Sequence, residues 1–92
     1  MIVGTAEIKL YAQWVHSLKE KRMVVKSIIA KAHNKFNVSI AEVDELDTHQ
    51  TIILGLACVT NSTSQSDKII DTVLNFIESN TEAQIVDIVR NC

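Results

Sequence analysis

The spacing of apolar residues changes along the chain, and this change constrains the fold more than any other feature. Residues 2–13 alternate, with apolar or small residues at every even position. Period two over this length predicts a strand with one buried face. In residues 18–35 the apolar positions recur instead at spacings of three, four and seven, which is typical of one helical stripe. Ser17 and Glu20 form a capping-box pattern, so we expect this helix to begin at about residue 18.

The middle of the chain predicts two further strands. Residues 37–43 alternate again, and the polar residues 44–49 connect them to a nearly continuous apolar run at 51–60. A run of this kind favours a central strand that is buried on both faces.

A second helix is expected after the next run of polar residues. Its N-terminal cap is either Ser64 together with Asp67 or Ser66 alone. Asn80 suits its C-terminal end, and residues 82–90 predict a last strand. The apolar face of this helix contains Ile69, Ile70, Val73, Leu74, Phe76 and Ile77.

The resulting order is strand, helix, strand, strand, helix, strand. Each strand–helix–strand unit requires a right-handed crossover. Two such units joined by a hairpin predict an α+β protein with the ferredoxin-like βαββαβ fold, in which both helices lie on one face of a four-stranded antiparallel sheet. The chain has 92 residues, no proline and no low-complexity linker, so residues 1–92 are expected to form a single domain. A domain of this size buries only roughly 60–65% of the surface that its unfolded chain exposes.

The composition favours a soluble, cytoplasmic protein. Apolar residues make up 47% of the chain, and none of their runs approaches the roughly 18 residues of a membrane-spanning helix. The N-terminus has no basic stretch before an apolar one, so we expect no secretory signal. Cys58 and Cys92 form neither a CxxC pair nor a disulfide framework. We expect Cys58 to be a small buried hydrophobic residue and Cys92 to lie at a frayed terminus.

Four segments are informative together once they are placed on this layout. They are MIVG at 1–4, HSLKEKR at 16–22, KFNVSIAEV at 35–43 and LGLA at 54–57. In combination they resemble the YlxP family, small bacterial proteins built from a domain of unknown function, and the resemblance covers essentially the whole chain. It implies a ferredoxin-like fold, a bacterial cytoplasmic origin and a gene near those for translation initiation and ribosome maturation. It carries over no catalytic residues, and His49 stands where relatives are expected to have an aromatic residue, often Trp.

Positive charge is concentrated on the first predicted helix. The net charge is −2, yet six of the nine Lys and Arg residues lie between positions 19 and 35, where Glu20 is the only acidic residue. That segment therefore carries +5 and the remainder of the chain −7. Because the apolar stripe must face the sheet, we expect these cations to face water and to hold a phosphate backbone without reading sequence. The candidate nucleic-acid-binding residues are Lys19, Lys21, Arg22, Lys26, Lys31 and Lys35.

A solvated helix face that only keeps the protein soluble is the competing interpretation. However, Lys19 and Lys21 lie in the first turn, where the helix dipole disfavours cations by roughly a few tenths of a kcal/mol per charge. This placement and the genomic context of the family favour a non-catalytic, RNA- or ribosome-associated binding module. We expect it to need no cofactor, no small-molecule substrate and no membrane.

Self-association is the alternative prediction. If both helices cover one face of the sheet, apolar residues on the other face meet solvent, and such a patch usually marks an interface, most often in a two-fold dimer. Shielding by long polar side chains such as Glu7 and Lys9 is the competing interpretation. The candidate dimer-interface residues are Val3, Tyr11, Ile53, Ala57 and Val59. The alternative function is therefore a homodimeric structural or adaptor protein that binds another protein through this face.

Catalysis and metal binding find little support in the residues. No Ser, Cys or Lys has a recognisable activating partner, and two distant cysteines cannot hold an iron–sulfur cluster. The third strand lacks the aromatic residues on which RNA-recognition domains stack bases, and the first has only Tyr11 near its end. Residues 42–49 resemble a hard-metal loop but lack the glycine and terminal Glu of a calcium loop, so a solvated hairpin turn is expected. Its acidic residues are Glu42, Asp44, Glu45 and Asp47.

Overall fold

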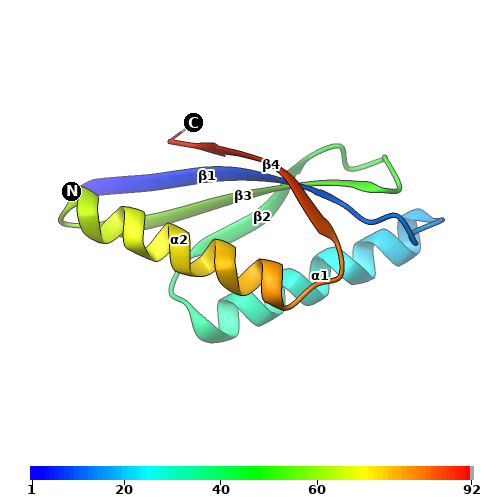
Figure 1. Cartoon of the computed structure of the whole chain (residues 1–92), viewed down its shortest axis with the longest axis horizontal. Helices are drawn as coiled ribbons and strands as arrows, with labels where there is room; N and C mark the ends of the chain where they lie inside the picture. The colour runs from blue at the N-terminus through cyan, green and yellow to red at the C-terminus, as the bar shows by residue number, and fades with distance from the viewer. Residues whose placement is uncertain (92) are drawn as a thin grey trace.

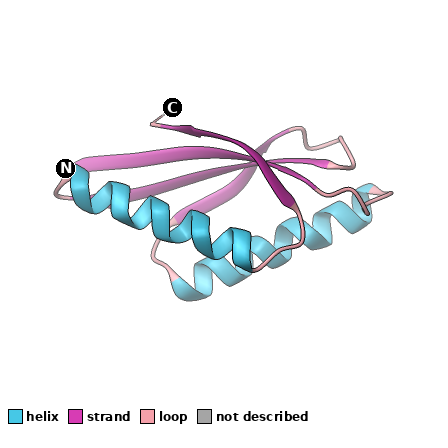
Figure 2. Ribbon diagram, in the orientation of Figure 1, coloured by secondary structure: helices cyan, strands magenta, loops and turns pink. Residues whose placement is uncertain are grey.

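The computed structural model describes residues 1–91, which form one sheet with two helices on one side of it (Figures 1 and 2). The sheet has four strands in the order β2-β3-β1-β4, and every neighbouring pair is antiparallel. This arrangement confirms the predicted α+β, ferredoxin-like βαββαβ fold. In chain order the elements are β1 (Ile2–Tyr11), α1 (Leu18–Lys35), β2 (Ser39–Asp44), β3 (Thr51–Thr60), α2 (Thr63–Ser79) and β4 (Gln84–Arg90).

The core lies between the sheet and the two helices. Even-numbered side chains of β1 and β3 point toward the helices, and cross-strand partners such as Ile8 and Leu54 are both fully buried. Ile28 of α1 and Ile70 of α2 close the core from the other side. The alternation in β1 therefore predicted its buried face correctly.

β3 is central, as predicted, but it is buried on one face only. Its even-numbered residues lie in the core, whereas Ile53 and Ala57 are half-buried and Val59 is 66% exposed. The prediction of burial on both faces is wrong because both helices cover the same face and no layer covers the other. We call this uncovered side of the sheet, which carries Ile53, Ala57 and Val59, the open face.

The two helices differ in how well their ends were predicted. α1 begins at Leu18, where the side chain of Ser17 accepts a hydrogen bond from the Glu20 amide at 3.1 Å. α2 begins earlier than expected, because Ser62 is its cap and accepts from the Gln65 amide at 3.2 Å. The predicted caps at Ser64 or Ser66 are therefore wrong, whereas Asn80 ends α2 as expected.

Two strands are shorter than their sequence patterns. β1 ends at Tyr11: the Ala12 amide still donates to the carbonyl of Gln50 in the β1–β3 register, but the chain then turns, and the Val15 amide donates to the carbonyl of Ala12. β4 begins at Gln84, after a short turn in which the Ala83 amide donates to Thr81 Oγ1 at 3.1 Å.

None of the helices in residues 1–91 combines the length and the apolar character needed to cross a bilayer. The cytoplasmic location stays a prediction.

Gly4 lies where Ser66 and Ile70 of α2 pack closely against β1. A Cβ atom at Gly4 would be 1.8 Å from Ser66 Oγ and 3.0 Å from Ile70 Cδ1. Ser66 is itself buried, with its Oγ 3.7 Å from the sulfur of Cys58. Cys58 is a buried free thiol, as predicted, and Cys92 lies outside the described residues. Only glycine therefore lets Ser66 pack against the sheet at this point.

We predict that Gly4→Ala lowers the free energy of unfolding by about 1–3 kcal/mol, because the new methyl group must displace Ser66 and Ile70. Urea unfolding monitored by circular dichroism measures the loss. Since Ser66 Oγ is the nearest obstacle, Gly4→Ala/Ser66→Ala should lose less stability than the two single variants added together. Strictly additive losses would contradict this contact.

Candidate functional site

The six basic residues predicted to form one cationic surface occupy three different environments. Lys21 is fully buried, Lys31 and Lys35 contact α2, and Lys19, Arg22 and Lys26 face solvent. Each environment has a different consequence for function.

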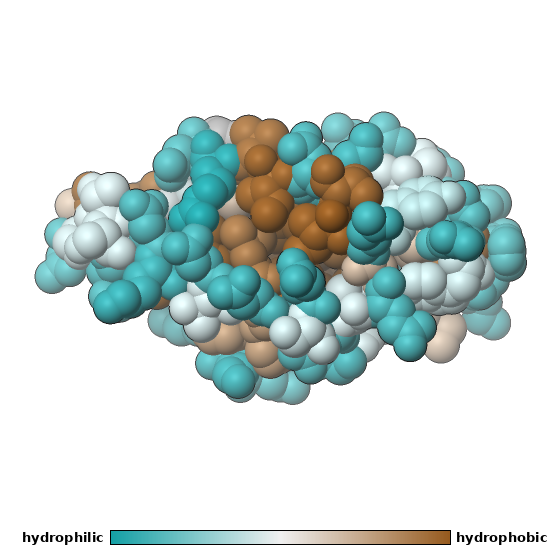
Figure 3. All heavy atoms as spheres, in the orientation of Figure 1, coloured by the Kyte–Doolittle hydropathy of each residue, from teal (hydrophilic) through white to brown (hydrophobic). Residues whose placement is uncertain are grey.

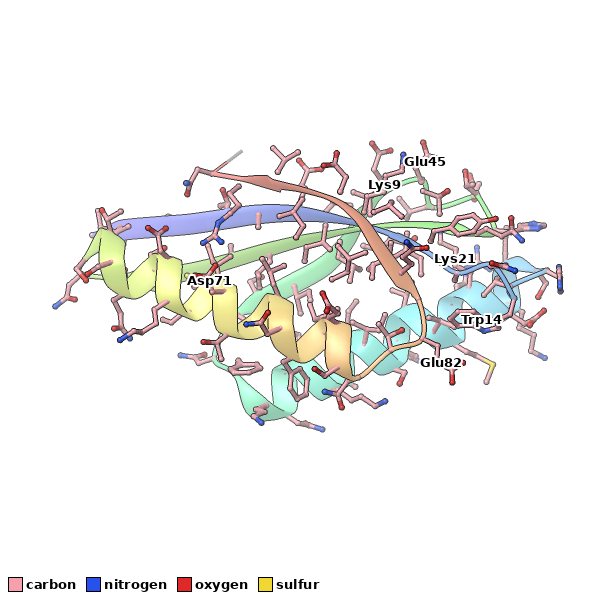
Figure 4. The ribbon with its side chains drawn as sticks, in the orientation of Figure 1. Lys9, Trp14, Lys21, Glu45, Asp71 and Glu82 are labelled. Atoms are coloured by element: carbon pink, nitrogen blue, oxygen red, sulfur yellow. The ribbon has the colours of Figure 1, made fainter. Side chains whose placement is uncertain are left out.

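Lys21 points from α1 toward the sheet, as Figure 4 shows. Its Nζ lies 2.8 Å from Glu42 Oε2 on β2 and also donates a hydrogen bond to the backbone carbonyl of Glu45. The prediction that Lys21 contacts a nucleic acid is wrong, because this ammonium group is buried and paired. The reason is helical spacing: Lys21 precedes Val25 and Ile28 by four and seven residues and so shares their buried stripe.

The Lys21 ammonium group also anchors the connection between β2 and β3. Glu45 has a positive φ of 56°, which is uncommon for a residue other than glycine. The turn is held by the Glu45 amide, which donates to Asp44 Oδ1 at 2.8 Å, and by Thr48 Oγ1, which donates to Glu45 Oε2 at 2.7 Å. The carboxylates of Asp44 and Glu45 are thus used within the hairpin. Residues 1–91 contain no group of three or more His, Cys, Asp or Glu side chains arranged to hold a metal ion.

Lys31 and Lys35 lie on the flank of α1 that faces α2. Lys31 Nζ donates to the carbonyl of Asn80 at 3.4 Å. Lys35 Nζ lies 5.1 Å from the ring centroid of Phe76, within the range of a cation–π contact. That ring packs edge-on against Phe36 with 5.2 Å between centroids. Both lysines are exposed, but they help to join the helices and do not continue the surface formed by the remaining cations.

Lys19, Arg22 and Lys26 form the α1 basic strip. They are exposed, follow one another at spacings of three and four along α1, and therefore share one face of the helix. None of the three makes an ion pair with any of residues 1–91. Glu20, the one acidic residue of α1, uses its Oε1 to accept from the His16 amide and the Ser17 hydroxyl. The strip is therefore a small cationic surface that has no carboxylate partner among the described residues.

The five predicted interface residues all lie on the open face, but they do not form one apolar surface. Val3 and Val59 are cross-strand partners and are 52% and 66% exposed. Tyr11 is 37% exposed at the opposite end of β1, while Ile53 and Ala57 are half-buried.

Charged side chains divide the open face between these ends. Glu7 and Lys9 project from β1 in the middle of the face, and Asp87 of β4 stands opposite Lys9. Val43, which the sequence analysis did not single out, covers Gly55 there: a Cβ at Gly55 would be 2.8 Å from Val43 Cγ1. The dimer predicted through this face stays a prediction.

A hollow of about 500 Å³ opens at the end of the sheet where β1 stops and β4 starts. Trp14, which is 40% exposed, and Glu82 lie near each other there, as Figure 4 shows. Tyr11 and His16 line the same hollow, and they also line a second hollow of about 620 Å³ that includes His49. No local sequence pattern indicated this grouping, because it forms only when the β1–α1, β2–β3 and α2–β4 connections meet.

Comparisons with known proteins identify the family. Residues 3–90 match the family described as "Protein of unknown function (DUF503)". The chain belongs to this family. It is also 42% identical, over 83 residues and 90% of each chain, to the "Uncharacterized protein YlxP" of Bacillus subtilis (strain 168). These matches confirm the YlxP-like resemblance.

A solved structure supports the fold alone. The solution NMR structure of the de novo designed protein LFR1 1, described as having a ferredoxin fold, superposes with a TM-score of 0.61. The match covers 99% of this chain and 84% of the designed one, at 19% sequence identity.

We predict that Lys21→Met lowers the free energy of unfolding by about 3 kcal/mol, because it leaves a mostly buried carboxylate without its counter-ion. Glu42 Oε2 has no hydrogen-bond partner in residues 1–91 besides this ion pair. The double variant Lys21→Met/Glu42→Leu should recover most of the loss, since it removes both charges. Chemical unfolding of the three proteins measures this, and an unchanged stability of Lys21→Met would contradict the buried position.

Proposed function

We propose that this protein is a non-catalytic binding module that holds the phosphate backbone of RNA on the α1 basic strip. The observation that carries the proposal is the exposure of Lys19, Arg22 and Lys26 on one helix face without an ion pair in residues 1–91. The chain as a whole carries a net charge of −2, so this surface is local.

The placement of these cations opposes helix stability. Like charges at spacings of three or four destabilise a helix by about 0.2–0.5 kcal/mol per pair. Lys19 also lies in the first turn, where the helix dipole disfavours a positive charge. The nearby carboxylates could relieve this repulsion, but Glu20 caps the helix and Glu42 pairs with Lys21. A polyanion would provide the missing counter-charges.

The dimensions of the strip suit several consecutive phosphates. Lys19 and Lys26 are seven residues apart, which corresponds to about 10 Å along a helix. Lysine and arginine contacts to phosphate oxygens fix the position of a nucleic acid but carry no sequence information. We therefore propose binding that depends on salt and tolerates different RNA sequences.

The test is binding of a short fluorescent single-stranded RNA at low salt, measured by anisotropy. For the unmodified protein the logarithm of affinity should fall against the logarithm of salt concentration with a slope of about −2, because three contacts release counter-ions from a single strand. Lys19→Glu/Arg22→Glu/Lys26→Glu should weaken binding by more than about tenfold.

A second triple variant with the same change in net charge is the control. Lys31→Glu/Lys35→Glu/Lys68→Glu alters cations that lie off the strip, so it should retain most of the affinity. Equal losses in the two variants would show a response to net charge alone and would refute a localised site. Absence of binding by the unmodified protein would refute the proposal itself.

A second candidate function is an adaptor that binds another protein on the open face. It is favoured by one observation: Val3 and Val59 lie directly opposite each other and are each more than half exposed. Val3→Lys/Val59→Lys should then release a protein partner that remains bound after nuclease treatment, while the α1 triple variant retains it.

A further inference from the structure

β4 is an edge strand with an exposed apolar surface. It pairs with β1 on one side only, and Val86, Ile88 and Val89 are 49%, 39% and 50% exposed. Figure 3 shows the corresponding apolar surface gathered in the middle of the view, where the ribbon of β4 crosses the molecule in Figure 1. α2 packs mainly on β1 and β3 and reaches β4 through the ion pairs of Arg90, which leaves Ile88, on the same side of β4, 39% exposed.

The usual protections of an edge strand are weak here. Natural edge strands are commonly blocked by Lys, by Pro or by bulges. This chain has no proline, and the one cation of β4, Arg90, is held by Asp71 and Asp67 of α2. A bulge occurs near Val86, but the strand is regular from there to its C-terminal end.

The outward backbone groups of β4 can be assigned from its pairing with β1. The Asn91 amide donates to the carbonyl of Thr5 at 2.7 Å, so it points toward β1. Because backbone groups alternate in direction along a strand, the amides of Ile88 and Arg90 point away from the sheet. The Ile88 amide donates to its neighbour's carboxylate, Asp87 Oδ1, at 2.9 Å. This local bond satisfies the amide but can be exchanged for the carbonyl of another strand.

We propose that a second copy of this chain pairs with the free edge of β4, with the two strands antiparallel across a two-fold axis at Ile88. Each Ile88 amide then exchanges Asp87 for the carbonyl of the other copy's Ile88, and the two four-stranded sheets become continuous. The proposal does not depend on RNA binding.

Charge favours this register. An axis at Asp87 would place two carboxylates directly opposite each other, which is destabilising. An axis at Ile88 pairs Ile88 with itself and sets Asp87 against Val89 of the second copy. Val86 then stands opposite Arg90, whose charge is already balanced by α2. The strand can thus pair with its own copy without placing like charges directly opposite each other.

Symmetry favours a second copy over pairing between different edges. The other edge of the sheet is β2, which carries Glu42 and ends in Asp44. β4 paired with β2 of another copy would leave free edges at both ends and propagate into fibres. Pairing of β4 with β4 uses the same surface on both copies and closes at two.

Sedimentation of the full-length protein from micromolar to millimolar concentration tests the proposal. We expect a discrete dimer in the unmodified protein. Ile88→Lys should raise its dissociation constant at least about tenfold, because it places like charges opposite each other at the axis. Val59→Lys adds the same charge on the open face, at a more exposed position, and should leave the dimer intact. Circular dichroism checks that both variants fold.

A third variant is expected to change affinity in the opposite direction. Asp87→Ala removes the acceptor that competes for the Ile88 amide, so the dimer should tighten about threefold to tenfold. A lower dissociation constant cannot result from misfolding, provided that the Asp87→Ala protein still sediments as a discrete dimer. A dimer that Asp87→Ala leaves unchanged or weakens would refute pairing through the Ile88 amide.

Two further outcomes would overturn the proposal. A monomer throughout the concentration range would leave the β4 edge to a strand of a different protein. A dimer that persists in Ile88→Lys but dissociates in Val59→Lys would place self-association on the open face.

Discussion

The buried ammonium group of Lys21 is the interaction on which the arrangement around α1 depends. It connects α1 to β2 through Glu42 and to the β2–β3 turn through the carbonyl of Glu45, so one side chain fixes a helix, an edge strand and a hairpin. A buried ion pair contributes little net stability compared with apolar residues, but it penalises any arrangement in which one charge lacks its partner. It also determines the charges that remain available. Glu42 is used inside the domain, so it cannot neutralise the cations on the outer face of α1.

The fold could be predicted from the sequence because the spacing of apolar residues changes clearly from one element to the next. The alternation in β1, the helical stripe of α1 and the apolar run of β3 each place one side of an element in the core. The predictions failed where one local pattern was compatible with two different arrangements of the neighbouring elements. An apolar run identifies a central strand but does not show whether a second layer covers it, as β3 demonstrates. Several serines near the start of α2 satisfy the capping preference; Ser62 is the cap, while Ser66 lies within the helix and packs against Gly4.

The candidate sites were less predictable because they depend on which elements become neighbours. Lys21 was predicted to be exposed because it is charged, although its spacing to Val25 and Ile28 already placed it on the buried stripe of α1. Glu42 gave a second signal, because it follows Ile40 by two residues and must point to the same face of β2. Lys31 and Lys35 follow Lys26 by five and nine residues, so helical spacing already places them off the α1 basic strip, but their contacts with Asn80 and Phe76 follow only from the position of α2. The exposed edge of β4 follows only from the strand order.

The two proposed surfaces lie on different elements, and this separation has a consequence for binding. α1 packs against β2, at one edge of the sheet, whereas β4 is the other edge. Pairing of two β4 strands would therefore leave both basic strips free at the outer ends of the dimer. A single strip offers three cations, which gives only weak and strongly salt-dependent affinity for a phosphate backbone. In a dimer, an RNA bound to one strip could reach the second strip within the same complex, provided that it is long enough to span both. Binding to the second strip would then be intramolecular, so the affinity would rise without any new type of contact.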